Sequence, residues 1–143
     1  MEYNTAFPLL RPHVNPDNEG FWQGVRDHRL VFQKCDYCGL IVHRPRPTCP
    51  QCLSNQKSWV PSEGKGHVYT YATVVNPRTG YPGINAPYSV VVVELLEGVR
   101  LLGNMYDVEP EDIYIGMPIE VVFDDIAEDL TLPKFKKRED QAK

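Results

Sequence analysis

The chain has 143 residues, the size of one domain or of a small metal-bound module joined to one compact β unit. Its formal net charge of −4 argues against a domain that binds nucleic acid through phosphates, because such domains are usually basic. The longest apolar run, Val90 to Val93, is too short for a membrane span, and 13 prolines with 10 glycines indicate many turns and little helix.

The N-terminal segment has no basic region followed by an apolar run, so no secretory signal is visible and we expect a soluble, cytoplasmic protein. Residues 1–14 contain two prolines among apolar residues and predict an extended arm that needs a surface to lie on. The sequence Asn15 to Asp17 is typical of a helix start, and the helix is expected to run to about His28. Three apolar residues share one face of this helix: Phe21, Trp22 and Val25. Residues 1–29 are therefore predicted to form an N-terminal arm and helix.

Two C-x-x-C pairs, separated by ten residues, contain every cysteine of the chain: Cys35 with Cys38, and Cys49 with Cys52. This spacing is typical of a zinc ribbon, in which each pair offers two thiolates to one tetrahedral ion. Four thiolates leave no position for water or substrate, so the Zn²⁺ is expected to be structural. Two alternatives use the same cysteines. A thioredoxin-type redox pair is disfavoured by the helix-poor setting with two pairs, and structural disulfides would need an oxidising compartment.

The residues next to the cysteines fit a metal site. Gly39, directly after the first pair, can adopt a positive φ, whereas Leu53 follows the second pair and makes that half less favourable. A Zn²⁺ with four thiolates carries two net negative charges, which nearby basic residues would offset. These are Lys34, Arg44 and Arg46. His43 is expected to be a surface histidine, because the four cysteines already complete the coordination.

Apolar segments flank the first cysteine pair. Residues 30–34 predict a strand that delivers Cys35, and residues 40–43 predict its hairpin return, so residues 30–60 form the predicted ribbon. The alternating arginines and prolines of residues 44–47 keep the following segment extended, with its guanidinium groups outward where they could meet an anion.

The second half of the chain is rich in β-branched and aromatic residues. Five strands are predicted there, at residues 67–75, 88–95, 99–106, 119–123 and 130–135. The connections leave no room for crossover helices, so the sheet should be antiparallel and close into a small Greek-key barrel, most commonly an OB-fold. Residues 61–136 are assigned to this barrel and residues 137–143 to a charged, solvated tail. The long loop at residues 76–87 is expected to be functional or ordered by a partner.

Three sequence blocks follow the helix and the four-cysteine ribbon: Gly66 to Val74, Pro87 to Leu95, and Gly116 to Val121. In this order they resemble the zinc-ribbon/OB-fold proteins that partner acyl-CoA enzymes, whose ribbon is rubredoxin-like. The likeness covers residues 15 to 136. It implies a mainly β chain that acts as a non-catalytic subunit and assembles with a thiolase-like enzyme, or in some cases with a hydratase of the hot-dog fold.

The resemblance also implies a division of chemistry. The partner carries the nucleophilic cysteine and performs thiolysis, retro-aldol cleavage or acyl transfer, often on aromatic or steroid-type acyl-CoA intermediates. This chain fits that division, because all its cysteines are committed to metal and it contains no G-x-S-x-G, phosphate loop or H-E-x-x-H motif. Ser89 has no visible base, and Asp124 and Asp125 are expected to be solvated carboxylates at a strand end. Glu94, within an apolar run, could face outward or pair with a partner, and the pattern does not decide between these.

An accessory subunit would bury surface on the partner and could help to hold CoA. Large amphipathic rings contribute most at interfaces, so the candidate anchors are Tyr71, Tyr81 and Tyr88, with barrel packing as their alternative role. Guanidinium groups can bind phosphates in a bidentate way, so the candidate CoA contacts are Arg44, Arg46 and Arg78.

The alternative function is a module that binds single-stranded nucleic acid, with bases stacked on Tyr69, Tyr71 and Tyr106. The charge disfavours it, because residues 87–130 contain one arginine, Arg100, and many acids.

Overall fold

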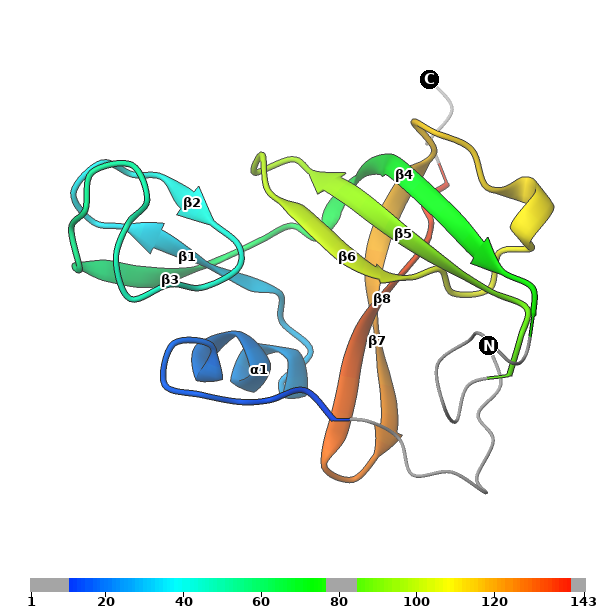
Figure 1. Ribbon diagram of the computed structural model, residues 1–143, viewed down its shortest axis with the longest axis horizontal. Helices are drawn as coiled ribbons and strands as arrows, with labels where there is room; N and C mark the ends of the chain where they lie inside the picture. Colours follow the sequence, from blue (N-terminus) through cyan, green and yellow to red (C-terminus); the bar gives the residue numbers. More distant parts are fainter. Residues whose placement is uncertain (1–10, 77–84, 140–143) are drawn as a thin grey trace.

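The structure is a computed structural model that describes residues 11–76 and 85–139. It contains a three-stranded sheet and a five-stranded sheet, with one helix below the smaller sheet and beside the β7–β8 hairpin in the view of Figure 1. The helix and the smaller sheet are α1 (Glu19–Arg26), β1 (Val31–Cys35), β2 (Ile41–Val42) and β3 (Lys57–Pro61). The larger sheet and its short 3₁₀ turn are β4 (Lys65–Val74), β5 (Tyr88–Leu95), β6 (Arg100–Asn104), η1 (Pro110–Asp112), β7 (Pro118–Ala127) and β8 (Leu130–Lys137). Within the described residues, no helix has the length and apolar character needed to cross a membrane.

Helix α1 begins about one turn later than the sequence predicts. The Asn15 side-chain oxygen accepts hydrogen bonds from the backbone N–H groups of Asp17 and Asn18, at 2.9 and 3.0 Å. This asparagine therefore organises a turn that leads into the helix at Glu19. Phe21 and Val25 are buried as predicted, and Trp22 packs against the same core. After the helix, His28 adopts a positive φ of 58° and redirects the chain toward β1.

The smaller sheet has the order β2-β1-β3, and both pairings are antiparallel. The long pairing runs from Val31 opposite Pro61 to Cys35 opposite Lys57. The short pairing sets Gln33 opposite Val42 and Lys34 opposite Ile41. The predicted hairpin is therefore present. The sequence pattern did not indicate β3 as the third strand.

The larger sheet has the order β6-β5-β4-β7-β8, and its neighbouring strands are antiparallel. Its two outer strands meet through a parallel bridge between Met105 and Phe135, beside which the Tyr106 N–H donates to the Phe135 carbonyl at 2.7 Å. Five strands closed in this way form a barrel, so the prediction of a mainly β chain with a five-stranded barrel is confirmed. β8 continues through Lys136 and Lys137, two residues that the sequence analysis left outside the last strand.

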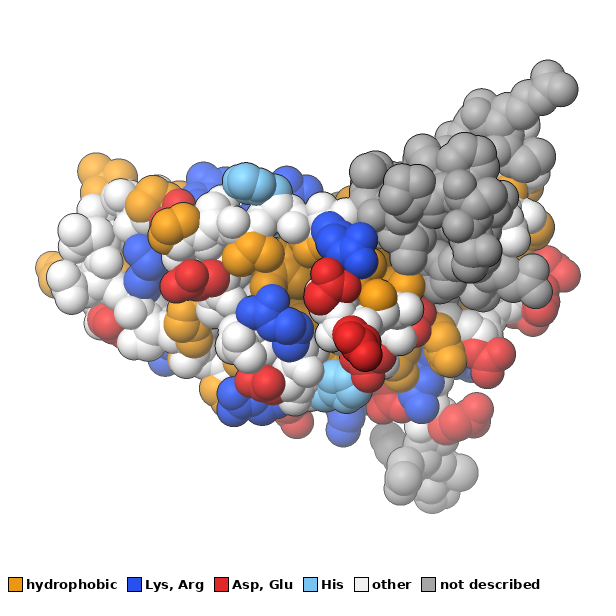
Figure 2. Space-filling view, turned by 90° about the horizontal axis from the view of Figure 1, so that it is seen from below, with side chains coloured by type: hydrophobic (Ala, Val, Ile, Leu, Met, Phe, Trp, Pro, Cys, Tyr) orange, Lys and Arg blue, Asp and Glu red, His pale blue; other side chains and the backbone are white. Residues whose placement is uncertain are grey.

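One hydrophobic cluster connects the parts of the chain. It contains Phe21 and Val25 of α1, Phe32 of β1, and the barrel interior, in which Val68 and Phe135 are fully buried. The helix and the base of the small sheet therefore share a core with the barrel. Figure 2 shows exposed hydrophobic side chains in the middle of one face, with basic and acidic side chains around them. Among the described residues of that face, the basic side chains are interspersed with acidic ones and form no continuous basic surface.

Gly66 illustrates how tightly the sheet is built. It lies on β4 opposite Leu95 of β5, and a Cβ atom at this position would overlap the backbone carbonyl oxygen of Glu94. Backbone atoms in a ladder cannot move aside as a flexible side chain can. Only glycine fits there without a shift of the two strands.

We expect Gly66→Ala to lower the free energy of unfolding by about 2–3 kcal/mol, since the added methyl group must push two paired strands apart. Urea denaturation measures this change. The control is Gly98→Ala, where the added Cβ meets no atom within 4 Å and the cost is confined to the positive φ of 87°, about 1–2 kcal/mol. An equal or smaller loss for Gly66→Ala than for Gly98→Ala would contradict the close approach.

Candidate functional site: a four-cysteine centre

The four cysteines converge at one end of the small sheet. Cys35 is the last residue of β1, Cys38 lies in the turn after it, and Cys49 and Cys52 lie in the loop between β2 and β3. All four sulfur atoms lie within 4.8 Å of one another. The Sγ atoms of Cys35 and Cys52 are 3.5 Å apart, and those of Cys38 and Cys49 are 3.6 Å apart.

These distances fit a tetrahedral metal site. Zn–S bonds of about 2.3 Å place neighbouring sulfurs about 3.8 Å apart. The observed separations are too long for a disulfide, whose sulfurs are about 2.05 Å apart, and the four cysteines are free. The donor set of four thiolates favours Zn²⁺ and closes the coordination, so a bound ion would hold the loops together.

Both turns that carry the cysteines adopt the same backbone conformation. Gly39 has a φ of 79° and Leu53 a φ of 65°, and their N–H groups donate to the carbonyls of Cys35 and Cys49, each at 3.0 Å. The second turn was expected to be less favourable. It forms with the same hydrogen bond as the first, but a positive φ is sterically unfavourable for leucine and not for glycine, so its backbone is more strained. The Leu53 side chain lies in solvent, where it meets no clash.

The four cysteine thiols differ in pKa, although their sulfur atoms lie close together. The backbone N–H of Cys38 lowers the pKa of the Cys35 thiol to about 6, against the opposing effect of burial. At Cys52 the backbone N–H of Ser54 lowers the pKa, but burial and hydrogen bonds with the other sulfurs outweigh it and raise the pKa to about 12. A divalent cation removes this conflict because it stabilises all four thiolates together.

Gln33 positions the segment that follows β2, a role that the sequence analysis missed. This side chain is buried, donates to the Arg46 carbonyl at 2.6 Å and accepts from the Arg46 N–H at 2.7 Å. The pair of bonds fixes the backbone of residues 44–47 against β1, while the side chains of Arg44 and Arg46 stay exposed. A glutamine in a strand has no local signal for such a long-range partner.

His43 is not a surface histidine, which corrects the expectation from sequence. Its ring lies 5.1 Å from the Phe21 ring and 5.5 Å from the Phe32 ring. Burial lowers the pKa of His43 to about 4, with a further contribution from Arg44, so the ring is neutral at physiological pH. The reason is strand periodicity: His43 follows Ile41 by two residues, and Ile41 packs on the hydrophobic core.

The predicted interface residues lie in different environments. Tyr71 is 39% exposed on β4, whereas Tyr88 is 7% exposed at the start of β5. Tyr81 and Arg78 lie outside the described residues. Arg44 and Arg46 lie on the ribbon, so the structure brings neither of them to the barrel strand that carries Tyr71.

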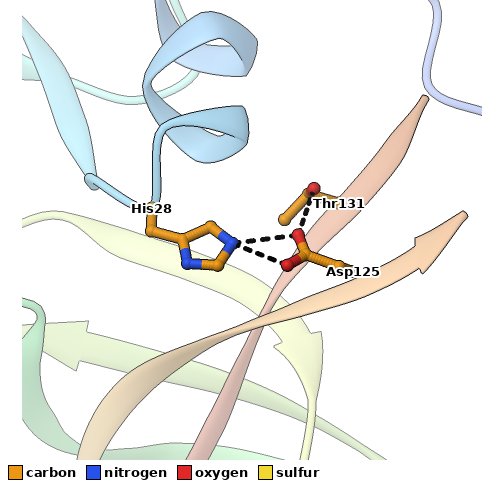
Figure 3. A network of polar contacts seen from close by, with 3 residues as sticks. All are labelled: His28, Asp125 and Thr131. Carbon is orange, nitrogen blue, oxygen red and sulfur yellow. Dashed lines mark hydrogen bonds and ion pairs between the residues drawn. The ribbon is translucent and has the colours of Figure 1, made fainter. Parts of the chain in front are cut away.

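Asp124 and Asp125 lie within β7 and not at its end, which corrects the expected position; the Asp125 side chain is solvated as expected, with 57% of it exposed, whereas Asp124 is mostly covered. Asp124 forms an ion pair with Lys134, whose side chain is fully buried. The Asp125 carboxylate accepts from the Thr131 hydroxyl at 2.6 Å and lies 2.9 Å from His28 Nε2 (Figure 3). The β7–β8 ladder is responsible, because it sets Asp125 directly opposite Thr131.

The His28–Asp125 contact joins two distant parts of the chain. His28 comes from the turn after α1, and Asp125 comes from the β7–β8 hairpin (Figure 3). The His28 ring also stacks on Phe123, with centroids 5.3 Å apart and planes inclined by 9°. The hydrogen bond from Thr131, together with that from His28, lowers the pKa of Asp125.

Glu94 faces the outside of the sheet and pairs within the chain. It lies opposite His67 on β4 and opposite Arg100 on β6, at 3.7 and 3.1 Å. The Arg100 guanidinium also lies 3.8 Å above the centroid of the Tyr69 ring. Ser89 is buried and exchanges a hydrogen bond with Thr73 at 2.9 Å, so it has a structural role.

Fold and site together define a protein with a four-cysteine zinc ribbon followed by an OB-fold barrel. Two family descriptions match consecutive parts of the chain: the rubredoxin-like zinc ribbon domain of ChsH2 at residues 22–57, and the C-terminal OB-fold domain of ChsH2 at residues 59–124. The chain belongs to the ChsH2/DUF35 family of zinc-ribbon OB-fold proteins.

Similar proteins extend the comparison. A DUF35 domain-containing scaffold protein of Methanocaldococcus jannaschii is 38% identical over 111 residues, which cover 76% of this chain and 77% of that protein. A probable enoyl-CoA hydratase alpha subunit of Thermomonospora curvata is 38% identical over 126 residues, covering 88% of this chain but only 39% of that longer protein. The solved structure described as "Ltp2-ChsH2(DUF35) aldolase" contains a chain with 38% identity and a TM-score of 0.83 that covers 89% of this chain and 98% of its own length.

We expect the purified chain to contain one tightly bound zinc, and Cys49→Ser to lose it together with the fold of the ribbon, because three thiolates bind the ion less tightly than four. Metal analysis by mass spectrometry and backbone NMR of residues 31–61 measure both effects. The control is Tyr37→Ala, which changes an 82% exposed side chain between two cysteines without removing a ligand. A Cys49→Ser protein that keeps its zinc and its ribbon signals would contradict the assignment.

We expect the stabilising effect of Asp125 to depend on pH. Its pKa is lower in the folded chain than the usual value of about 3.9, so its ionised form stabilises the fold above that pH, and this contribution is lost as the pH falls through the folded pKa. The free energy of unfolding of Asp125→Asn should therefore lie below that of the wild type near neutral pH and approach it in acid.

Urea denaturation of both proteins between about pH 7 and pH 3 measures this convergence. Asp107→Asn is the matched control, because Asp107 is exposed, has no side-chain bond among the described residues and has a positive φ of 58° that asparagine tolerates. A difference between wild type and Asp125→Asn that stays constant over this range would argue against the ionised contact.

Proposed function

We propose that this chain is a non-catalytic, zinc-stabilised subunit of a complex that processes acyl-CoA. Its partner is a thiolase-like or aldolase-like enzyme, or a hydratase of the hot-dog fold. The observation that carries the proposal is the agreement along nearly the whole chain with the ChsH2(DUF35) chain of a structure described as an aldolase, at 38% identity and a TM-score of 0.83. The name "scaffold protein" of the Methanocaldococcus jannaschii relative supports the same role.

The chemistry of the described residues supports a non-catalytic role. All four cysteines converge on one centre, so no thiol is left to act as a nucleophile toward an acyl group. Ser89 is buried and bonded to a threonine, and the Asp125–His28 pair is bonded to Thr131 in a contact that joins two segments of the fold. We therefore place the nucleophile and the acid–base groups on the partner, which would act on aromatic or steroid-type acyl-CoA by thiolysis, retro-aldol cleavage or acyl transfer.

Contact with CoA is a further part of the proposal. Arg44 and Arg46 are exposed, and their guanidinium groups form no ion pair with the described residues, so both are free to bind phosphate. Tyr71 is exposed enough to contribute to a partner interface, whereas Tyr88 is buried in the chain itself. Arg78 and Tyr81 stay predictions from the sequence.

A nucleic-acid role has less support. OB-folds bind single strands through aromatic rings beside a basic groove, and Tyr69, Tyr71 and Tyr106 are partly exposed. The Tyr69 ring, however, is covered by Arg100, whose charge is offset by Glu94. A groove that follows phosphates needs several unpaired cations along the strand face, and the cation that lies over the Tyr69 ring is already paired with Glu94.

We expect the tagged chain, expressed in its native host, to co-purify with an acyl-CoA enzyme that mass spectrometry identifies. The chain alone should not turn over acyl-CoA, and the partner should lose most of its activity or solubility when this chain is omitted. Retention on heparin that falls with salt would instead favour nucleic acid. Turnover by the isolated chain, or a partner fully active without it, would refute the proposed role.

A further inference from the structure

A groove of about 570 Å³ runs between the barrel, helix α1 and the ribbon. All five residues of β6, from Arg100 to Asn104, line it. The opposite side is formed by Phe21 and Trp22 of α1 and by residues 43–45 after β2. β6 is the border strand of the sheet on the side of α1 (Figure 1). The groove therefore follows the edge of a β-strand.

The hydrogen-bond pattern of β5 and β6 shows which backbone groups face this edge. The Leu95 N–H donates to the Val99 carbonyl, and the Met105 N–H donates to the Ser89 carbonyl. Residues of an antiparallel strand alternate between facing the partner strand and facing away. Counting from these two bonds, the backbone N–H and C=O groups of Leu101 and Gly103 point toward β5. Those of Arg100 and Leu102 point away from β5, toward the groove.

A proline explains why β8 does not cover this edge. The parallel bridge of Met105 and Phe135 pairs β6 with β8 at one end. Two residues earlier on both strands, Gly103 lies beside Pro133. The Pro133 carbonyl oxygen is 3.5 Å from the point that a Cβ atom would occupy if Gly103 carried a side chain. Proline has no N–H group to continue the ladder. In the described part of the chain, Leu102 and Arg100 are paired with β5 alone, and the bridge to β8 lies further along, at Met105.

The walls of the groove define what could occupy it. Phe21, Trp22 and Leu132 supply apolar surface, and Leu102 is 58% exposed beside them. Among the described lining residues none is Asp or Glu, although the chain as a whole has a net charge of −4. Arg44 lines the groove without an ion-pair partner among the described residues.

We propose that an extended, acidic segment of the partner protein binds in this groove as an added β-strand along β6. Its backbone pairs with Arg100 and Leu102, its apolar side chains pack on the groove walls, and a carboxylate binds Arg44. The proposal rests on the proposed function, because it takes the occupant from the partner enzyme. It assigns Arg44 to the partner segment, so the phosphate contact suggested above then depends on Arg46.

The experiment uses the zinc-loaded full chain and a defined probe, a blocked hexapeptide of alternating valine and glutamate. Amide NMR shifts report binding at each residue. We expect saturable shifts at Arg100 and Leu102, and at least tenfold weaker binding by Leu102→Pro than by Leu102→Ala. The proline removes an N–H that faces the groove and none that bonds to β5, and the alanine keeps that N–H while it removes the same side chain. Arg44→Gln should weaken binding, and Arg46→Gln should not.

A second probe needs no variant of the chain. The same hexapeptide with every backbone nitrogen methylated keeps its side chains and its charge but cannot donate to the strand from either edge, so it should not bind. Absence of shifts with the acidic peptide, equal binding of its N-methylated form, or equal binding of a valine–lysine peptide or a thymidine oligonucleotide at β6 would each overturn the proposal. No partner enzyme is present in this experiment, so its failure would leave the proposed complex untouched.

Discussion

The interior of the ribbon is formed mainly by the sulfur atoms of its four cysteines. From Asp36 to Val60, Cys49 is the only buried residue, and at the start of this segment Cys35 closes β1. A loop of this length without apolar side chains inside cannot offset the conformational entropy that it loses on folding. A metal ion held by four thiolates contributes about 10–16 kcal/mol to such a module, enough to replace a hydrophobic core. The position of the four sulfurs therefore determines the conformation of the whole segment.

The ribbon gains its orientation from the other side of the molecule. Phe32 on β1 and Phe21 on α1 belong to the same hydrophobic cluster as the barrel interior, and His43 packs as a neutral ring against both. Polar contacts add to this attachment: His28 binds Asp125, and Arg11 binds Asp129, in each case linking the N-terminal region to the β7–β8 hairpin. The metal orders the loops, and the shared core fixes them relative to the barrel.

Local sequence patterns predict the parts of this architecture that depend on local chemistry. The spacing of the cysteines indicates the ribbon, because ligand geometry sets that spacing, and β-branched runs indicate the barrel strands, so that β5 begins and ends at the residues expected. The patterns do not predict pairings over long distances. Gln33 binds a backbone 13 residues away, and Asp125 meets a histidine 97 residues away, and neither contact leaves a mark in the neighbouring sequence. The burial of His43 is hard to predict for a related reason, since it depends on the face of a strand that is only two residues long.

The proposed complex would use groups that the fold itself leaves unpaired. Three ion pairs connect neighbouring strands or distant segments of the fold: Asp124 with Lys134, Asp125 with His28, and Glu94 with Arg100. Groups paired in this way hold neighbouring segments of the fold together. The backbone edge of β6 differs, because Pro133 stops the neighbouring strand from pairing with it and the groove beside it is apolar with one unpaired arginine. Unpaired strand edges promote association and are usually covered or charged in soluble proteins. The open edge of β6 lies between the barrel, α1 and the ribbon, which share one hydrophobic core. An open edge on such a rigid framework is the kind of surface that can bind a strand of another protein.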